Sequence, residues 1–242
     1  MNLTIDAGNT SVKMVLFDRD RITKVHTFKK LSVADLRTIF SKHSIQYSIL
    51  SAVIDTDKMI HRFLRANSFF IQLDSTTRLP VKNKYKTPST LGSDRLASAV
   101  GATKIFPGKN VLIIDAGTCI KYDFINAKHE YLGGSISPGL CMRFEALHNF
   151  TSRLPLIHPG NAGNLVGSTT KDAIRTGVQE GIIHEINGFI EQYKKRFRML
   201  KVVLSGGDAP MFAGRLKSSI FAAPNLIHVG LHEILKYNVE QE

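Results

Sequence analysis

Hydrophobic and polar positions alternate in two stretches of the chain, and the two stretches repeat one pattern. In 2–17 and again in 111–125, an apolar run ends in Asp-Ala-Gly, and a short polar turn leads into a second alternating run. A period of two is typical of β-strands, so each stretch predicts a strand, a tight turn and a second strand. The repetition predicts two related lobes in one chain.

The same reading of apolar spacing predicts the remaining elements. Strands are predicted at 22–28, 45–53, 69–73, 131–137 and 201–204. Helices are predicted at 32–43, 57–67, 95–106, 139–149, 168–197 and 228–238. Periodicity is lost over 74–93, where lysines interleave with Asn83 and Tyr85, and a loop of this length indicates a function rather than a simple connection. We expect an α/β protein with an N-terminal lobe at 1–108 and a C-terminal lobe at 109–242.

The two Asp-Ala-Gly turns carry candidate chemistry. Asp6 and Asp115 stand at the mouths of the turns, and Gly8 and Gly117 follow two residues later, where a glycine lets the backbone approach a ligand. Backbone N–H groups around such a turn form an anion-binding concavity, and the aspartate can hold a hydrated cation beside it. One Asp-Gly turn is ordinary hairpin chemistry, but two copies with the same flanks favour lobes that face each other across a phosphate.

Composition limits the class of protein. The chain has 242 residues, of which 43% are hydrophobic and 21% charged, as in soluble globular proteins. No apolar run approaches the length that spans a bilayer, and the chain begins in a predicted strand without a signal peptide, so we expect a cytoplasmic protein without a membrane partner. Cys119 and Cys141 are too few for a disulfide framework, and the nine histidines show no zinc-site spacing.

The charge balance indicates an anionic partner. Lys and Arg number 32 against 20 acidic residues, which gives a net charge of +12. Such an excess suits nucleotides or nucleic acid. The basic cluster at 194–201 ends a predicted helix, where cations are favourable in any case.

A further candidate lies where the unpatterned segment meets the next helix. The turn from Leu91 to Arg95 offers backbone amides and a guanidinium that could hold an anionic substrate, with the Asp94 carboxylate beside them. Alternatively, Ser93 or Asp94 caps the helix and Arg95 forms a surface ion pair, which is a common arrangement. These residues alone leave both interpretations open.

Five motifs occur in an order that resembles one known family, the type III pantothenate kinases. They are DAGNTSVK at 6–13, NKYKTPSTLGSDR at 83–95, DAGT at 115–118, GGSISPG at 133–139 and SGGDA at 205–209. The resemblance extends from Met1 to near Tyr237. It implies the actin-like ATPase fold, with two ribonuclease H-like lobes, each a mixed β-sheet flanked by helices.

The resemblance also implies a reaction and its cofactors. The reaction is transfer of the γ-phosphoryl group of ATP to pantothenate, giving 4'-phosphopantothenate in the first step of coenzyme A biosynthesis. The family pattern implies Mg²⁺ held through water by Asp6, and K⁺ or NH₄⁺ at Asp115. The implied ATP contacts are Asp6, Ala7, Gly8, Asn9, Thr10, Ser11, Val12, Lys13, Thr118, Gly206 and Gly207. Ala7, Cys119 and Lys121 depart from the family's usual residues, and Lys121 changes the charge near the implied K⁺ site.

On the substrate side, the family's general base corresponds to Asp94. The implied pantothenate contacts are Tyr85, Gly92, Ser93, Asp94, Arg95 and Thr170. The match at Thr170 is looser, because Thr169 stands where Asn is common and a helix N-cap explains both threonines equally well. The long helix predicted at 168–197 carries isoleucine and valine every four residues and the glycines Gly177 and Gly181, which predicts a homodimer. The resemblance at Thr170 implies in addition that the two subunits share the active site.

Two alternative functions are considered as well. One is a family-related accessory regulator of gene expression without kinase activity, although no helix-turn-helix, zinc or RNA-binding signature is present, so no specific nucleic-acid partner is expected. The other is an actin-fold kinase for another small acid or sugar. The segment 83–95 favours pantothenate over this second alternative, because a generic kinase has no reason to share that substrate loop.

Overall fold

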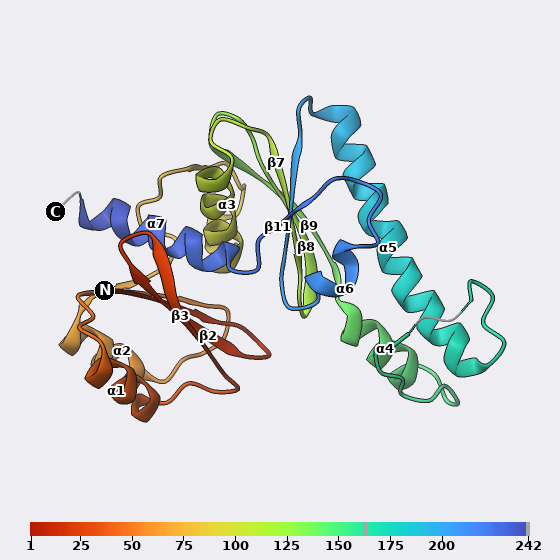
Figure 1. Cartoon of the computed structure of the whole chain (residues 1–242), viewed down its shortest axis with the longest axis horizontal. Helices are drawn as coiled ribbons and strands as arrows, with labels where there is room; N and C mark the ends of the chain where they lie inside the picture. Colours follow the sequence, from red (N-terminus) through yellow and green to blue (C-terminus); the bar gives the residue numbers. More distant parts are fainter. Residues whose placement is uncertain (162–163, 241–242) are drawn as a thin grey trace. The chain divides into compact units, whose positions relative to one another are not determined.

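The structure is a computed structural model that describes residues 1–161 and 164–240 (Figure 1). The chain forms two compact units. The first contains Met1–Gly108, Lys128–Leu132 and the chain from Asn225, and the second contains Lys109–Ala127 and Gly133–Pro224. The last helix therefore belongs to the first unit, whereas the predicted lobes, 1–108 and 109–242, follow chain order; that division stays a prediction.

The first unit is built on a five-stranded sheet in the order β3-β2-β1-β4-β5. β1, β2 and β3 are antiparallel neighbours, whereas β4 and β5 continue the sheet in parallel with β1. Because β1 lies in the centre, its side chains are buried on both faces. The strands are β1 (Asn2–Ala7), β2 (Val12–Asp18), β3 (Arg21–Phe28), β4 (Tyr47–Ala52) and β5 (Phe69–Gln72).

Alternation along β1 divides the first unit into layers. Leu3 and Ile5 pack into one apolar cluster with residues of α1 (Val33–Lys42) and α2 (Lys58–Asn67). Thr4, which points to the other face, contacts α7 (Leu226–Val239). The predicted start of the first helix at Ser32 is confirmed, since Ser32 is the N-cap of α1 and forms a reciprocal capping box with Asp35. The sheet thus lies between α1 and α2 on one face and α7 on the other.

α7 packs tightly against α3 (Ser93–Ile105), which is the helix that carries the candidate Asp94. A Cβ atom at Gly230 would lie 1.7 Å from the carbonyl oxygen of Ala97, so glycine is required where the two helices cross. The segment predicted to lack regular structure, 74–93, contains a two-residue strand, β6 (Lys82–Asn83), and a 3-10 turn at Pro88–Thr90. β6 pairs with the first residues of β9 (Glu130–Pro138).

The second unit repeats the hairpin on its own sheet. β7 (Val111–Ala116) and β8 (Cys119–Ile125) are antiparallel, and β10 (Lys201–Ser205) and β11 (Phe221–Ala222) extend the sheet in parallel beside β7. β9 follows β8 in the strand order. β7 is completely buried, as expected for a central strand.

The helices of the second unit cover this sheet (Figure 1). They are α4 (Leu140–Asn149), α5 (Thr170–Arg196) and α6 (Ala209–Ala213). The predicted stripe of α5 is confirmed as a buried face, and its residues Ile174, Val178, Ile182, Ile186 and Ile190 join the core beside β7 and β10. Val178 in particular is only 6% exposed, so this stripe serves the unit's own core and cannot be the dimer surface that the sequence suggested.

Helix length and polarity bear on membrane association. Among the described residues, every helix is too short or too polar to cross a bilayer.

Cys119 and Cys141 are free thiols.

Candidate active site

The first Asp-Ala-Gly turn joins β1 to β2. The Gly8 N–H donates to the Ser11 carbonyl oxygen at 3.1 Å, which closes the turn. Asp6 and Lys13 are direct cross-strand partners, so their side chains lie on one face of the hairpin, next to the turn. Asn9 and Thr10 are exposed at the tip. The turn therefore presents an ammonium group with hydroxyl and amide donors, which suit a phosphate, and a carboxylate that suits a cation beside it.

The start of α3 lies next to this hairpin. Asp6 is in register with Ser51 on the parallel neighbour β4, and the hydroxyl of Ser51 lies 2.9 Å from that of Ser93. Ser93 is the first residue of α3 and precedes Asp94. The structure thus brings the segment Gly92–Arg95 to the same end of the sheet as Asp6.

Asp94 lies in the first turn of α3 and not at its N-cap. Gly92 occupies the N-cap position and has no side chain that could form a cap hydrogen bond. Asp94 Oδ1 accepts instead from the N–H of Arg95 at 2.9 Å, and a Cβ atom at Gly92 would lie 2.5 Å from that oxygen. The carboxylate is therefore held against the first turn of the helix, where the positive end of the helix dipole favours negative charge.

Tyr85 and Arg95 extend the same group of residues. The Arg95 guanidinium lies over the Tyr85 ring, 5.6 Å from its centroid, and Arg95 is buried. The Tyr85 ring in turn lies 6.2 Å from that of Tyr131. The otherwise irregular segment after β5 is thereby anchored beside Asp94, and a cation–π contact of this kind is worth about 0.5–2 kcal/mol.

The second Asp-Ala-Gly turn joins β7 to β8 in the second unit. Asp115 is buried, and its Oδ2 lies 2.6 Å from the Nζ of its cross-strand partner Lys121. Thr118 stands in the turn, and its carbonyl oxygen accepts from the Gly139 N–H at 3.1 Å. The turn thus presents Thr118 beside a carboxylate that is already neutralised by an ammonium group.

The strand β10 brings Gly206 and Gly207 to the same sheet end, because Ser205 is in register with Asp115. Gly206 has φ +96°, and a Cβ atom there would lie 2.2 Å from the Ala116 carbonyl oxygen. That oxygen accepts from the Asp208 N–H at 2.9 Å, which ties the glycine turn to the hairpin. Burial raises the pKa of Asp208 above its ordinary value.

Replacement of Gly206 by alanine should lower the free energy of unfolding by roughly 2–4 kcal/mol, because alanine is strained at this φ and its methyl group meets backbone. Gly207 provides a matched control, since a Cβ atom there would have nothing within 4 Å. Chemical denaturation of both variants measures the difference. Equal stability of Gly206→Ala and Gly207→Ala would contradict the close approach to Ala116.

Thr170, the loosest of the matched substrate residues, lies next to a helix cap. It is the first residue of α5 and is exposed. The capping alternative holds for its neighbour, because the Thr169 hydroxyl accepts from the Asp172 N–H at 3.1 Å. Thr169 therefore accounts for the cap, and a role of Thr170 toward substrate stays a prediction.

Comparison with known proteins identifies the family. The family model described as type III pantothenate kinase matches residues 2–192. The chain belongs to the type III pantothenate kinase family. A type III pantothenate kinase from Bacteroides fragilis (strain YCH46) is 46% identical, and the alignment covers 98% of this chain and 98% of that protein. Family membership does not favour the regulator or the kinase for another small acid or sugar.

Solved structures confirm the actin-like ATPase fold predicted for this pantothenate kinase family member. A protein from Campylobacter jejuni, titled as a Baf family transcriptional activator, aligns with TM-score 0.62 and 22% identity over 98% of this chain and 99% of that one. The activator of 2-hydroxyisocaproyl-CoA dehydratase from Clostridium difficile, with bound ADPNP, aligns with TM-score 0.55 and 15% identity over 99% and 96%. At these identities the likeness concerns the fold alone.

Reasoning from sequence missed a polar network that supports the second hairpin of this kinase. Arg143 on α4 donates to Glu185 on α5 at 2.5 Å, to the Ser137 hydroxyl at 2.7 Å and to the Pro138 carbonyl oxygen at 2.8 Å. The buried Tyr122 donates to Glu185 at 2.8 Å. The network holds the GGSISPG segment, whose Gly139 contacts the Thr118 turn. No spacing in the sequence signals it, because its members come from four separate segments.

The charge of Glu185 is stabilised by this network. Burial acts to raise the pKa of its carboxyl group, but hydrogen bonds from Arg143, Tyr122 and Ser137 outweigh that effect, and the pKa lies below its ordinary value. Glu185 therefore stays ionised at neutral pH.

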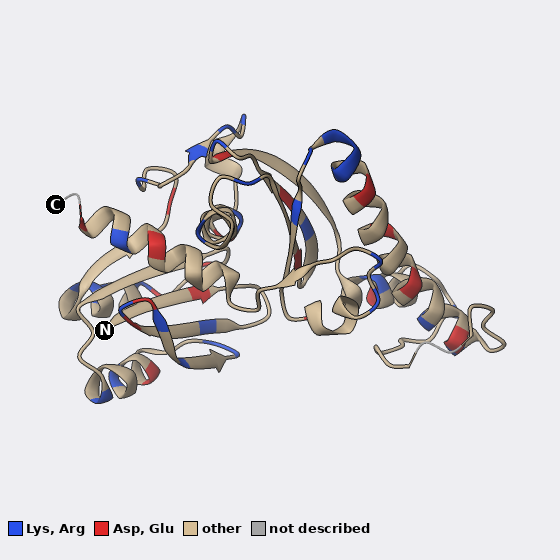
Figure 2. Ribbon diagram, turned by 45° about the horizontal axis from the view of Figure 1, so that its top comes forward, with Lys and Arg blue, Asp and Glu red and all other residues tan. Residues whose placement is uncertain are grey.

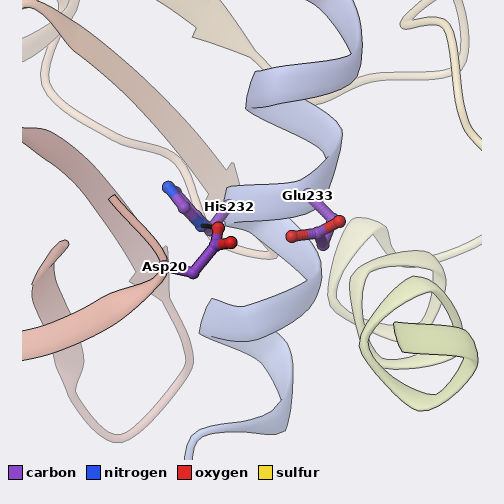
Figure 3. Close-up of side chains that lie close together, drawn as sticks. All are labelled: Asp20, His232 and Glu233. Atoms are coloured by element: carbon purple, nitrogen blue, oxygen red, sulfur yellow. Dashed lines mark ion pairs between the residues drawn. The ribbon is translucent and has the colours of Figure 1, made fainter. Parts of the chain in front are cut away.

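A carboxylate–histidine group on the first unit resembles a metal site at first sight (Figure 3). Asp20 from the β2–β3 turn lies near His232 and Glu233 of α7. However, Lys236 Nζ lies 2.8 Å from Asp20 and 3.2 Å from Glu233, and Lys104 lies 3.2 Å from Glu233. Two ammonium groups at these carboxylates repel a further cation, so the group is an ion-pair network.

Lysine and arginine residues occur along the ribbon of both units (Figure 2). The cluster at the end of α5 follows the helix dipole, as expected from sequence, and Lys194 also donates to the Ser218 hydroxyl at 3.0 Å. This placement gives a structural reason for the cluster and needs no nucleic-acid partner.

Proposed function

We propose that the protein transfers the γ-phosphoryl group of ATP to the primary alcohol of pantothenate, giving 4'-phosphopantothenate and ADP, the first step of coenzyme A biosynthesis. The family match carries the proposal, since it spans residues 2–192 and so includes both Asp-Ala-Gly hairpins and the segment 83–95. The grouping of Asp94, Arg95 and Tyr85 beside the Asp6 hairpin supports it.

Asp94 acts as the general base. It accepts the proton of the pantothenate alcohol as the new O–P bond forms and the bond between the γ-phosphorus and the leaving oxygen of ADP breaks. The N–H of Arg95 orients its carboxylate. The Arg95 guanidinium, the amides of Gly92 and Ser93 and the Tyr85 ring bind the substrate, whose own carboxylate suits a cationic, amide-rich turn.

The two hairpins bind the nucleotide. In the first unit, Lys13 and the hydroxyls of Thr10 and Ser11 contact phosphate oxygens. In the second unit, Thr118 contacts phosphate, and Gly206 and Gly207 present backbone to the adenosine. The open space beside Gly207 fits this role, since no heavy atom lies within 4 Å of where its Cβ would be.

The residues at the first hairpin fit Mg²⁺. Asp6 is partly exposed at the end of β1, next to the hydroxyl-bearing turn, and oxygen donors of this kind suit a hard cation that keeps most of its waters. Asp6 would hold the ion through water. When bound, Mg²⁺ neutralises charge on the phosphates.

The implied K⁺ or NH₄⁺ fits its position less well. Asp115, the expected ligand, is already paired with Lys121 at 2.6 Å, so its negative charge is balanced before any ion arrives.

A direct assay tests the proposed function. Purified protein is incubated with ATP, Mg²⁺ and pantothenate in potassium, sodium and large organic cation salts, and products are identified by mass. Formation of 4'-phosphopantothenate with matching ADP is expected. Parallel reactions with small sugars and other small acids should give no phosphorylated product, and phosphorylation of one of these instead of pantothenate would contradict the proposal.

We also propose that the protein is a homodimer with a shared active site, in which Thr170 contacts pantothenate bound by the other subunit. Exposed apolar side chains in the second unit support an interface, with Phe150 at 88%, Leu165 at 79% and Val166 at 82% exposure. Leu165 and Val166 lie in the segment that leads into α5. Gly177, on the exposed face of α5, leaves room for a close partner helix, because no atom of the described residues outside the α5 backbone and its chain neighbours lies within 4 Å of where its Cβ would be.

Gly177→Gln should therefore produce a folded monomer with reduced turnover. Glutamine favours the helix more than glycine by about 1 kcal/mol, so the fold should be retained while the close approach is blocked. Light scattering with circular dichroism measures both properties. Val178→Asp is unsuitable, because Val178 is buried in the core and the variant should unfold. A wild-type protein that is fully active as a monomer would contradict the shared site.

A further inference from the structure

The second hairpin has a built-in positive charge. Lys121 lies directly opposite Asp115 in the β7–β8 register, so the hairpin itself places the ammonium group on the carboxylate. The two groups are 2.6 Å apart, and their side chains are only 18% and 9% exposed. The register, rather than a chance surface contact, therefore sets this pair.

Burial makes a counter-charge at Asp115 necessary. An ionised carboxylate that is removed from water is strongly unfavourable unless a cation compensates it. Either a bound ion or a neighbouring side chain can supply that charge. An alkylammonium group and NH₄⁺ carry the same charge and the same kind of N–H donor, so Lys121 supplies what a small monovalent cation would supply.

The repeat supports a built-in role for the lysine. In the first hairpin, Lys13 stands opposite Asp6, and in the second hairpin Lys121 stands opposite Asp115. Each repeat thus places a lysine across from the aspartate of its Asp-Ala-Gly turn. In the second repeat the pair is buried, and the two charges of the pair balance each other, so Asp115 offers less attraction to a further cation.

We propose that the ammonium group of Lys121 replaces a monovalent cation beside the Thr118 turn, so that nucleotide binding and turnover in this protein do not require K⁺ or NH₄⁺. Lys121 is thus a positioning residue whose ammonium group contacts Asp115 at 2.6 Å and keeps the turn in its binding geometry. The effect on turnover rests on the proposed kinase function, whereas the effect on nucleotide binding does not.

The test compares wild type with Lys121→Thr, Lys121→Arg and the exposed control Lys109→Thr in potassium, ammonium and tetramethylammonium salts at equal ionic strength. Calorimetry with a non-hydrolysable ATP analogue gives affinity, and 4'-phosphopantothenate formation gives turnover. Wild type, Lys109→Thr and Lys121→Arg should vary by no more than about twofold between salts. Lys121→Thr should bind at least about tenfold more weakly in tetramethylammonium and recover in potassium or ammonium.

A second variant controls for loss of folding. The double variant Asp115→Asn/Lys121→Thr removes both charges, so it should fold and its melting temperature should not respond to potassium. In the single variant Lys121→Thr, potassium should raise the melting temperature. The proposal is overturned if wild type itself needs K⁺ or NH₄⁺, or if Lys121→Thr behaves alike in all salts. If the affinity pattern holds but no salt supports phosphopantothenate formation, the proposed function fails and this inference stands.

Discussion

Asp94→Asn should lower turnover by about 10²–10⁴, the usual effect of losing a general base, while nucleotide affinity stays close to that of wild type. Asparagine has nearly the same shape and its side-chain oxygen can still accept from the Arg95 N–H, so the start of α3 should be retained. What is lost is the carboxylate that takes the proton of the attacking alcohol. Steady-state kinetics and calorimetry with an ATP analogue separate the two effects.

Ser93→Ala is the matched control for this prediction. It removes the hydroxyl that lies 2.9 Å from Ser51, and so loosens the attachment of the α3 start to β4 without touching the carboxylate. Its effect on turnover should be much smaller than that of Asp94→Asn. Near-normal turnover in Asp94→Asn would remove Asp94 from the mechanism, and an equal loss in both variants would indicate that only the position of the helix start matters.

Acidification should destabilise the first unit at pH values where most proteins are still stable, because two of its histidines are buried and neutral. His228 contacts the Thr4 hydroxyl at 2.8 Å, and burial, with a smaller effect of Lys13, lowers its pKa to about 3. His232 stacks on Phe17 at 4.2 Å, and burial, followed by the charge of Lys236, lowers its pKa to about 4. Both side chains become ordinary histidines when the chain unfolds.

The sign of the pH effect on stability follows from proton uptake. Below the ordinary pKa of 6.5, the unfolded chain binds a proton at each histidine. In the folded protein, His232 binds one only near pH 4 and His228 only near pH 3. The free energy of unfolding therefore falls as the pH drops from about 6.5. Each histidine contributes up to about 1.4 kcal/mol per pH unit, so stability near pH 5 should be roughly 3–4 kcal/mol lower than near pH 7.5.

Urea denaturation between about pH 5 and pH 7.5 measures this slope, and the window avoids the acid range in which Glu185 also loses its charge. In His228→Gln and His232→Gln the slope should be about half that of wild type, because glutamine does not titrate. An unchanged slope in both buried-site variants would mean that these histidines do not titrate as their burial implies.

Elements with a local cause could be predicted from the sequence. Alternating apolar residues predicted both hairpins, and Ser32 predicted the start of α1, because a strand's two faces and a helix cap depend on neighbours within a few residues. The short strand β6 was missed, since its two residues form a strand only through pairing with the distant Glu130 and Tyr131. Pairing of that kind leaves no periodic signal in so short a segment.

The residues of the candidate site also fall into those that the sequence predicted and those that only the tertiary structure brought together. Sequence motifs identified Asp6, Asp94, Asp115 and the glycines of the turns, because their chemistry depends on residue type and short spacing. Tertiary structure was needed to bring Ser93 to Ser51 beside Asp6, and to join Arg143 and Glu185 under the second hairpin. Those contacts connect residues far apart in the chain, and only the packing of whole elements sets them.

Sequence by itself determined the repeat, the family pattern and the residues able to bind phosphate, since each depends on order and spacing along the chain. Tertiary structure decided the surroundings of individual side chains. It turned the apolar stripe of α5 inward, buried His228 and His232, and removed the Asp115–Lys121 pair from water. The reason is physical: desolvation and ion pairing depend on what surrounds a group in space, and that is settled only when distant segments pack together.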